Sequence, residues 1–311
     1  MPTPMYWKKK VILLKTEGTY GTDAAPTGAL NAILARNVTF NENPTTGQPR
    51  DLVKPTLGNV VEPRTLRHVE LTFDVEMAGS GTVDVPPAYG PALRACGLAE
   101  TVNATVSVQY DPVSAAYESA SAYINIDGVL HKMLGVRGSV SLVIEPNAVP
   151  VYRFTLQGLH VDPAAVALPP AVFTAFKDPL PVSNVNTPTF TLHATASILR
   201  ALTLDLAQAV VHQDLIGAED IQITGRNPRG SVTMRMPDLA IKDWFGAAKA
   251  ETLGALQLIH GTAAGGIVTI DAPAVQLINP RRNIVDDIVF LEADLNITEV
   301  AGDDELRITT S

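Results

Sequence analysis

The sequence predicts an all-β protein, made of β-sandwich or barrel units that are each flanked by an α-helix. Three observations support this. Apolar and polar residues alternate along much of the chain, helical periodicity is confined to short segments, and a proline-rich stretch lies near the middle. Alternation with a period of two is typical of strands that bury one face. The 311 residues are enough for two domains, each with its own core.

The segment 69–77 shows the alternation most clearly. Leu71, Phe73 and Val75 are predicted to face a core, while Glu70 and Asp74 face the other way. The same pattern predicts further strands at 105–110, 122–126, 139–144, 151–157, 189–198, 202–206, 221–224, 231–236, 266–270, 275–278 and 288–297.

Helical signals are few. The segment 89–98 follows two prolines, and the segment 243–258 begins at Asp243, a favourable N-cap residue. Each comes shortly after a strong strand, and each is predicted to be a helix. A third, short helical segment is predicted at 31–35.

The stretch 161–188 contains six prolines, and proline at this density interrupts both helices and strand ladders. We therefore predict a first domain at 1–165, a surface linker at 166–188 and a second domain at 189–311. The order strand, long loop, strand, helix and closing strands occurs on both sides of the linker. This order predicts an internal repeat.

Composition limits the possible functions. A net charge of −9 disfavours tight binding of nucleic acid through its phosphates, but it allows nucleic acid to slide past. Cys96 is the single cysteine, which excludes internal disulfides and cysteine-rich zinc sites. The apolar run near the N-terminus is too short for a signal peptide or a membrane span. We expect a soluble protein made in the cytoplasm, without a membrane anchor.

Motifs of catalysis and cofactor binding are absent from the sequence. It has no G-x-S-x-G, H-E-x-x-H or G-x-x-x-x-G-K-[ST] motif, and its six histidines are isolated from one another. The acidic pairs at 286–287 and 303–304 lack the spacing of a calcium loop. We expect no cofactor, no metal and no enzymatic activity. A hydrolase whose triad is assembled from distant residues stays open as an alternative.

The segment 15–40 reads KTEGTYGTDAAPTGALNAILARNVTF. It resembles the start of the tail tube proteins, or major tail proteins, of long-tailed phages with non-contractile tails (siphophages). Segments 76–81, 93–98, 110–112, 135–138, 214–221 and 302–306 also resemble this family. The signature residues that match are Glu17, Tyr20, Gly21, Thr22, Asp23, Pro26 and Asn31.

The resemblance implies two tandem tail-tube-like units and a structural role in the virion. Chains of this family form rings, and the rings stack into a hollow tube that carries the genome to the host. With two units per chain we expect a trimeric ring of pseudo-sixfold symmetry, with a hexamer as the alternative. The implied partners are further copies of the chain, the tape measure and tail terminator proteins, and DNA that passes without tight binding.

A wall that lets DNA slide needs acidic residues on the face that lines the lumen. In the alternative interpretation these faces meet solvent or another subunit. The candidates for the lumen are Glu70, Asp74, Glu76, Glu292 and Asp294.

Ring stacking needs extensions that reach a neighbour, and the N-terminal segment 1–10, the loop 41–64 and the tail 300–311 could provide them. The loop is poor in apolar residues, so we expect it to order against a partner; in the alternative it is only a mobile surface loop. The candidates for contact between subunits are Tyr6, Trp7, Asn43, Gln48, Arg50, Leu52, Leu57, Val60, Asp303 and Asp304.

A carbohydrate-binding or adhesin-like β-sandwich at a tail tip is the rival function. Sugar-binding sites commonly present aromatic platforms. Aromatic residues make up only 5% of this chain, which disfavours glycan binding.

Overall fold

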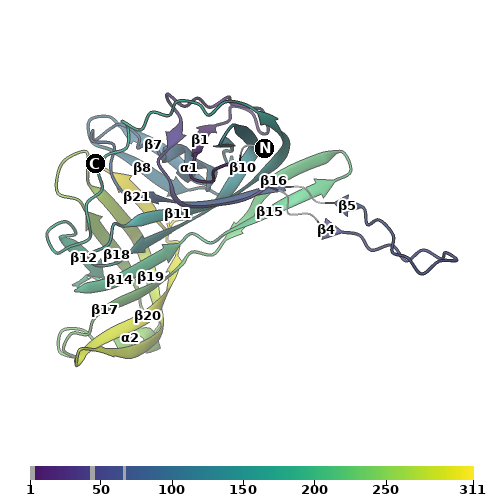
Figure 1. Ribbon diagram of the computed structural model, residues 1–311. Coiled ribbons are helices and arrows are strands. Elements are labelled where there is room, and N and C mark those ends of the chain that lie inside the picture. Colours follow the sequence, from purple (N-terminus) through teal and green to yellow (C-terminus); the bar gives the residue numbers. More distant parts are fainter. Residues whose placement is uncertain (1–3, 43–45, 66–67) are drawn as a thin grey trace.

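The computed structural model describes residues 4–42, 46–65 and 68–311. The described chain is almost entirely β, with large antiparallel sheets and two short helices, which confirms the predicted fold class. Figure 1 shows a body of long strands from which an extended arm projects.

Eight strands form one continuous antiparallel sheet that contains strands from both halves of the chain. They pair in the order β3–β6–β11–β10–β14–β17–β20–β19. Their bounds are Arg36–Asn41 (β3), His68–Glu76 (β6), Val151–Ala165 (β11), Val129–Ile144 (β10), Leu199–Asp205 (β14), Arg229–Arg235 (β17), Ile288–Thr298 (β20) and Val268–Val285 (β19).

The two halves of this sheet have the same internal order. In the first half β3 pairs with β6, β6 with β11, and β11 with β10. In the second half β14 pairs with β17, β17 with β20, and β20 with β19. Each half has an insertion between its first two strands and a helix after the second, α1 (Gly90–Ala95) and α2 (Trp244–Lys249). Both first strands also contain a register shift opposite the second. This is the order of elements on which the predicted repeat depends.

The other strands extend from β10 and β19. β9 pairs with β10 and continues to β1 and β2, while β19 pairs with β18 and β21, which lead to β12 and β8. Their bounds are Lys10–Thr16 (β1), Ala32–Ile33 (β2), Leu98–Asn103 (β7), Ser107–Pro112 (β8), Ala120–Ile126 (β9), Thr189–Leu192 (β12), Thr195–Ala196 (β13), Leu253–His260 (β18) and Arg307–Thr310 (β21).

The apolar faces of these strands meet in one large core. Phe73, Phe154 and Leu142 from the first half are fully buried in the same cluster as Leu204 and Val232 from the second. Alternation explains this burial, because every second residue of a strand points to the same face. Predicted strand 69–77 is β6, with the expected residues in the core.

Two helix predictions are wrong. The segment 243–258 is helical only as far as Lys249, and β18 begins at Leu253. Leu256 and Leu258 also fit a period of two, and pairing with β12 and β19 on both sides outweighs the helical spacing of the segment. The segment 31–35 is not a short helix, because Ala32 and Ile33 pair with β1.

The proline-rich segment 166–188 contains no helix or strand. It is fixed to the first half by backbone hydrogen bonds from Val166 to Gly128 and from Val172 to Gly28. The ring of Phe176 packs against the core. The segment therefore crosses the surface as an ordered strap, and the domain boundaries placed around it stay a prediction.

Two glycine-rich turns, one in each half, lie against each other. The amide of Gly81 donates to the carbonyl of Gly265 over 2.8 Å. A Cβ atom on Gly79 would lie 2.1 Å from the Gly265 oxygen, which is far inside van der Waals contact. Only glycine permits this approach of the two backbones.

Two hairpins project from the sheet, one after the end of β3 and one after the end of β14. One is the arm, which spans residues 46–65 and corresponds to the predicted loop. Its base is the ladder of β4 (Thr46–Gly47) and β5 (Arg64–Thr65). The other pairs β15 (Gln208–Leu215) with β16 (Ala218–Arg226). Because neighbouring strands alternate in direction, β3 and β14 run the same way, and both hairpins leave from one end of the sheet (Figure 1).

Candidate assembly interface

The five predicted lumen residues lie on one face of the eight-stranded sheet. Residues directly opposite each other in a ladder share a face, and the ladders connect Asp74 through Arg153, Ser141, Asp205 and Arg229 to β20. The predicted acidic residues of β6 and of β20 therefore belong to the same polar surface. Their role in a lumen stays a prediction.

Arginines neutralise most of this acidic set. The Asp74 carboxylate is almost fully buried and accepts hydrogen bonds from Arg153 Nε at 2.9 Å and from Asn37 Nδ2 at 2.8 Å. Burial alone would raise the pKa of Asp74, but these hydrogen bonds outweigh it and hold the pKa below its ordinary value. Glu76 lies 3.3 Å from Arg36.

The acids of β20 are neutralised in a similar way. Arg281 on β19 pairs with Glu292 at 2.5 Å and lies 3.8 Å from Asp294. Glu70 instead contacts two groups without a permanent charge, Asn41 and His68, each at 3.3 Å. The surface is therefore a mosaic of both charge signs rather than a uniformly acidic wall.

The sequence prediction missed these arginines, although one signal was available. Arg153 lies in the predicted strand 151–157 at a position that alternates with apolar residues. That spacing places its side chain on the polar face. The sequence did not reveal that β6, which carries Asp74, would be the neighbouring strand.

The family signature forms a buried hydrogen-bond centre. The Glu17 carboxylate accepts from the Gly21 amide at 2.8 Å, Ser119 Oγ at 2.6 Å, Ser121 Oγ at 2.8 Å and the Gly135 amide at 2.9 Å. These donors come from its own turn, from β9 or the residue before it, and from β10. Glu17 thereby fixes the signature turn to two strands of the first half.

Tyr20 extends this centre to the second half. Its hydroxyl accepts from the Ile221 amide of β16 at 2.6 Å, and Arg137 lies 4.8 Å from its ring. Arg137 in turn donates to the Ile221 carbonyl at 2.8 Å. A Cβ at Gly135, where φ is +58°, would lie 2.6 Å from the Tyr20 ring, so glycine is required there.

The other signature residues are also structural. Asp23 accepts from Lys132 Nζ at 2.8 Å and from the Tyr123 hydroxyl. Burial opposes ionisation of Asp23, but these hydrogen bonds prevail and lower its pKa. Gly21 has a φ of +70°, which favours glycine. The Thr22 amide donates a hydrogen bond to the Thr19 carbonyl, and the Asn31 side-chain oxygen accepts one from the Thr27 amide. Pro26 is buried.

The predicted stacking residues fall into three places. Tyr6 and Trp7 are about half exposed, and Lys10 Nζ lies 3.8 Å from the centre of the Trp7 ring. Asp303 and Asp304 are held within the chain, Asp303 by Arg226 and Ser114 and Asp304 by the amides of residues 300 and 301. Asn43 lies outside the described residues. The arm carries Gln48, Arg50, Leu52, Leu57 and Val60.

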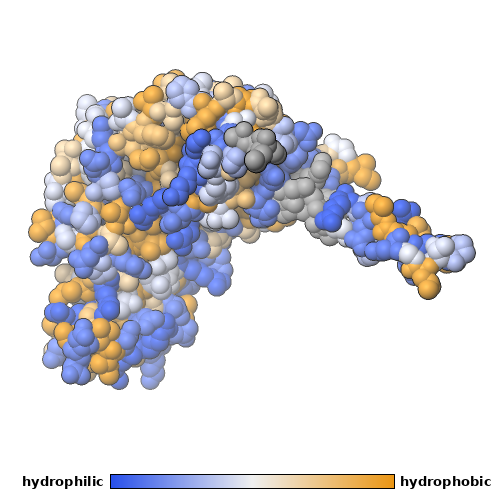
Figure 2. Space-filling view, in the orientation of Figure 1, coloured by the Kyte–Doolittle hydropathy of each residue, from blue (hydrophilic) through white to orange (hydrophobic). Residues whose placement is uncertain are grey.

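The arm exposes aliphatic side chains that the chain itself does not cover. Val53 and Leu57 are fully exposed and Val61 is 83% exposed, and Figure 2 shows apolar patches along the arm. The arm is nevertheless closed at its tip by a hydrogen bond from Lys54 Nζ to the Asn59 carbonyl at 2.9 Å. The exposed apolar residues of the arm therefore lie on a loop whose tip is held by a hydrogen bond.

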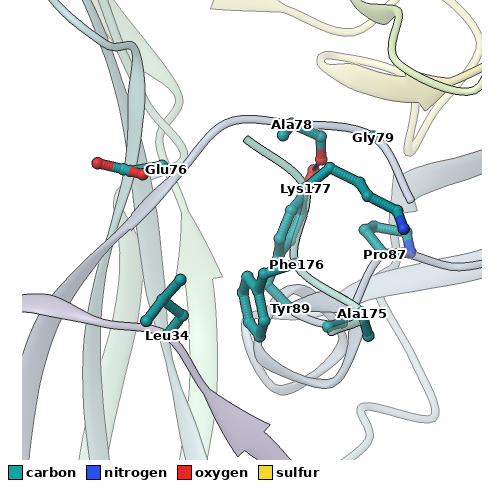
Figure 3. Close-up of a pocket in the computed structure, with 10 residues that line it drawn as sticks. Leu34, Glu76, Ala78, Gly79, Pro87, Tyr89, Ala175, Phe176 and Lys177 are labelled. Atoms are coloured by element: carbon teal, nitrogen blue, oxygen red, sulfur yellow. Dashed lines mark hydrogen bonds between the residues drawn. The ribbon is translucent and has the colours of Figure 1, made fainter. Parts of the chain in front are cut away.

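The described residues offer little for chemistry. They contain no group of three or more His, Cys, Asp or Glu side chains arranged to hold a metal. Cys96 is fully buried, and burial raises the pKa of its thiol. The cavity in Figure 3, between Phe176, Leu34 and Tyr89, has a volume of about 20 Å³, which is room for about one water molecule.

Comparison with known families identifies the chain. A model of the phage tail tube protein family matches residues 7–309. The chain belongs to this family. The match includes the signature, both projecting hairpins and the whole eight-stranded sheet, and it confirms the resemblance found in the sequence. Membership implies a structural role in the virion.

A search of curated proteins found no match. In the described part of this tail tube protein, no helix has the length and apolar character of a membrane span.

Proposed function

We propose that this protein is the wall subunit of a non-contractile phage tail tube. Chains close into rings, rings stack, and the genome passes through the bore from the virion to the host. The family match over residues 7–309 carries this proposal. The expected assembly is a trimeric ring of pseudo-sixfold symmetry, with a hexamer as the alternative, completed by tape measure and terminator proteins.

Stacking is assigned to the arm. Burial of a Val or Leu side chain contributes about 1.5–3 kcal/mol, and Val53 and Leu57 remain fully exposed in the single chain. The opposite end of the strands also exposes apolar side chains, namely Leu239, Ile241 and Ile288. An arm that reaches this end of a subunit in the next ring would cover both sets.

The polar face of the eight-stranded sheet is the proposed lumen wall. Its acids alternate with Arg36, Arg153 and Arg281, so it carries no strong net positive charge. Little counterion release would accompany DNA contact with such a wall, and DNA could slide without being held.

Electron microscopy tests the proposal. The purified protein is expected to form rings or tubes of uniform bore, alone or on a nucleating tail tip. The variant Val53→Asp with Leu57→Asp should still form rings but not long tubes, whereas Val106→Asp, at an exposed turn of the body, should form tubes normally. A protein that stays monomeric at high concentration, even on a tip, would contradict the proposal.

A further inference from the structure

Histidines contact the residues that flank the arm on both sides. Before the arm, the Glu42 carboxylate lies 2.8 Å from Nδ1 of His131, on β10. The Phe40 ring packs edge-on against the same imidazole, with 5.1 Å between the ring centres. After the arm, His68 begins β6, and its ring centre lies 5.1 Å from that of His212, on β15. The second of these contacts joins the arm to the hairpin of the other half.

Hydrogen bonds fix both rings of the pair formed by His68 and His212. His212 Nε2 lies 3.0 Å from the Glu219 carboxylate on β16, and His68 Nε2 lies 3.3 Å from the Glu70 carboxylate on β6. The second oxygen of Glu70 accepts from the side chain of Asn41, the last residue of β3, at 3.3 Å. One network therefore runs from the hairpin β15–β16 to both strands between which the arm is inserted.

The contact between the two rings excludes water. The His212 side chain is 5% exposed and that of His68 is 18% exposed. In the described part of the chain, Nδ1 of each ring is buried and has no hydrogen-bond partner. The Nε2 bond of each ring stays within its own strand or hairpin, so this network crosses from the hairpin to β6 through the packing of the two rings.

The hairpin is itself fixed to the first half of the chain. Ile221 of β16 is fully buried, and its amide donates to the Tyr20 hydroxyl. At the start of β15, the Gln208 amide donates to Ser139 Oγ at 3.0 Å, and Gln208 Nε2 donates to the Cys96 carbonyl at 2.9 Å. A hairpin held at its base and along its length can support a neighbouring segment.

The arm has little support of its own. The ladder of β4 and β5 contains two residue pairs, and an isolated two-stranded ladder is at best marginally stable in water. We propose that His212 is a positioning residue, which acts through His68 to fix the direction in which the arm leaves the sheet. The second half of the chain thereby orients the arm of the first half. The inference rests on the proposed function, in which the arm is the stacking element.

Double electron–electron resonance measures the direction of the arm in solution. Spin labels on Thr56→Cys in the arm and on Ala164→Cys in β11 report the distance between arm and body, since both positions are exposed. Cys96 is fully buried and should stay unlabelled. An excess of unlabelled protein prevents distances between different chains from contributing.

Without a further substitution, the labelled protein should show a narrow distribution of distances. His212→Ala removes one ring and should broaden the distribution about twofold, because a segment without a fixed contact samples more orientations. His212→Phe keeps a flat ring and should restore most of the narrow distribution. The matched control is Val211→Thr, at the preceding, exposed position of β15, which should leave the distribution unchanged.

His68→Ala tests the same contact from the side of the arm and leaves the hairpin intact. It should broaden the distribution as His212→Ala does. The double variant should add nothing further, because both substitutions remove one contact. Hydrogen exchange at the Ile221 amide shows whether the hairpin stays folded. If His212→Ala accelerates this exchange, His68→Ala decides the result.

The outcomes separate this inference from the proposed function. A narrow distribution in both alanine variants would overturn the positioning role of His212. Equal broadening in His212→Phe and His212→Ala would overturn the ring contact as its cause. In the electron microscope, His212→Ala should form intact rings but shorter tubes. Failure of the unmodified protein to form rings or tubes would refute the proposed function, and the distance distributions would still decide whether His212 orients the arm.

Discussion

Replacing Glu17 by Ala should destabilise the protein strongly. The substitution removes the acceptor of four hydrogen bonds, two from serine hydroxyls and two from backbone amides. Ser119 is 4% exposed and Ser121 fully buried, so lost partners are not easily replaced by water. A buried donor left without a partner costs about 1–3 kcal/mol. Because the hydroxyls can reorient, we expect a total loss of about 3–5 kcal/mol.

Urea unfolding followed by tryptophan fluorescence measures this loss, because Trp244 is buried in the core shared by both halves. The matched control is Glu145→Ala, since Glu145 is exposed and no side-chain bond is described for it. The control should change the free energy of unfolding by less than about 0.5 kcal/mol. A loss below about 1 kcal/mol for Glu17→Ala would refute the view that the signature glutamate is a structural centre.

Three further predictions concern other contacts. Gly79→Ala should lower the melting temperature by several degrees, because its methyl group would collide with the Gly265 carbonyl; an unchanged temperature in a thermal scan would contradict this. Tyr20→Phe should cost about 1 kcal/mol and increase hydrogen exchange at the Ile221 amide, which loses its acceptor. Asp74 has a lowered pKa when folded, so its stabilisation should be present above about pH 4 and disappear as pH falls through that lowered value. Urea midpoints of the wild type and Asp74→Asn should therefore differ at pH 7 and converge in acid.

The sequence predicted those parts of the fold that local patterns encode. The alternation at 69–77 identified β6, and that at 151–157 identified the start of β11. β1 was not predicted, because its apolar residues form a continuous run without alternation. Segments 266–270 and 275–278 were predicted as separate strands but belong to the single long β19.

The candidate site was only partly predictable, because its contacts join residues far apart in sequence. The acids of β6 and β20 were found from alternation, whereas their arginine partners depend on which strands become neighbours. The signature residues were recognised as a set. Their structural role could not be deduced, since three of the four donors to Glu17 lie more than 100 residues away.

Because the two halves belong to one chain, the segment 166–188 keeps them together and would affect how quickly the proposed ring forms. Each association of separate molecules costs several kcal/mol in translational and rotational freedom, and a peptide linker removes this cost for every joint within a chain. In the proposed ring, a chain that supplies two units halves the number of molecules that must come together. If the two halves act as two units of the proposed ring, they can differ, and only one of them needs to carry the long arm. Nucleation of the proposed ring would be faster. Because only the first half carries an arm, the arms that link successive rings would be found at every second unit.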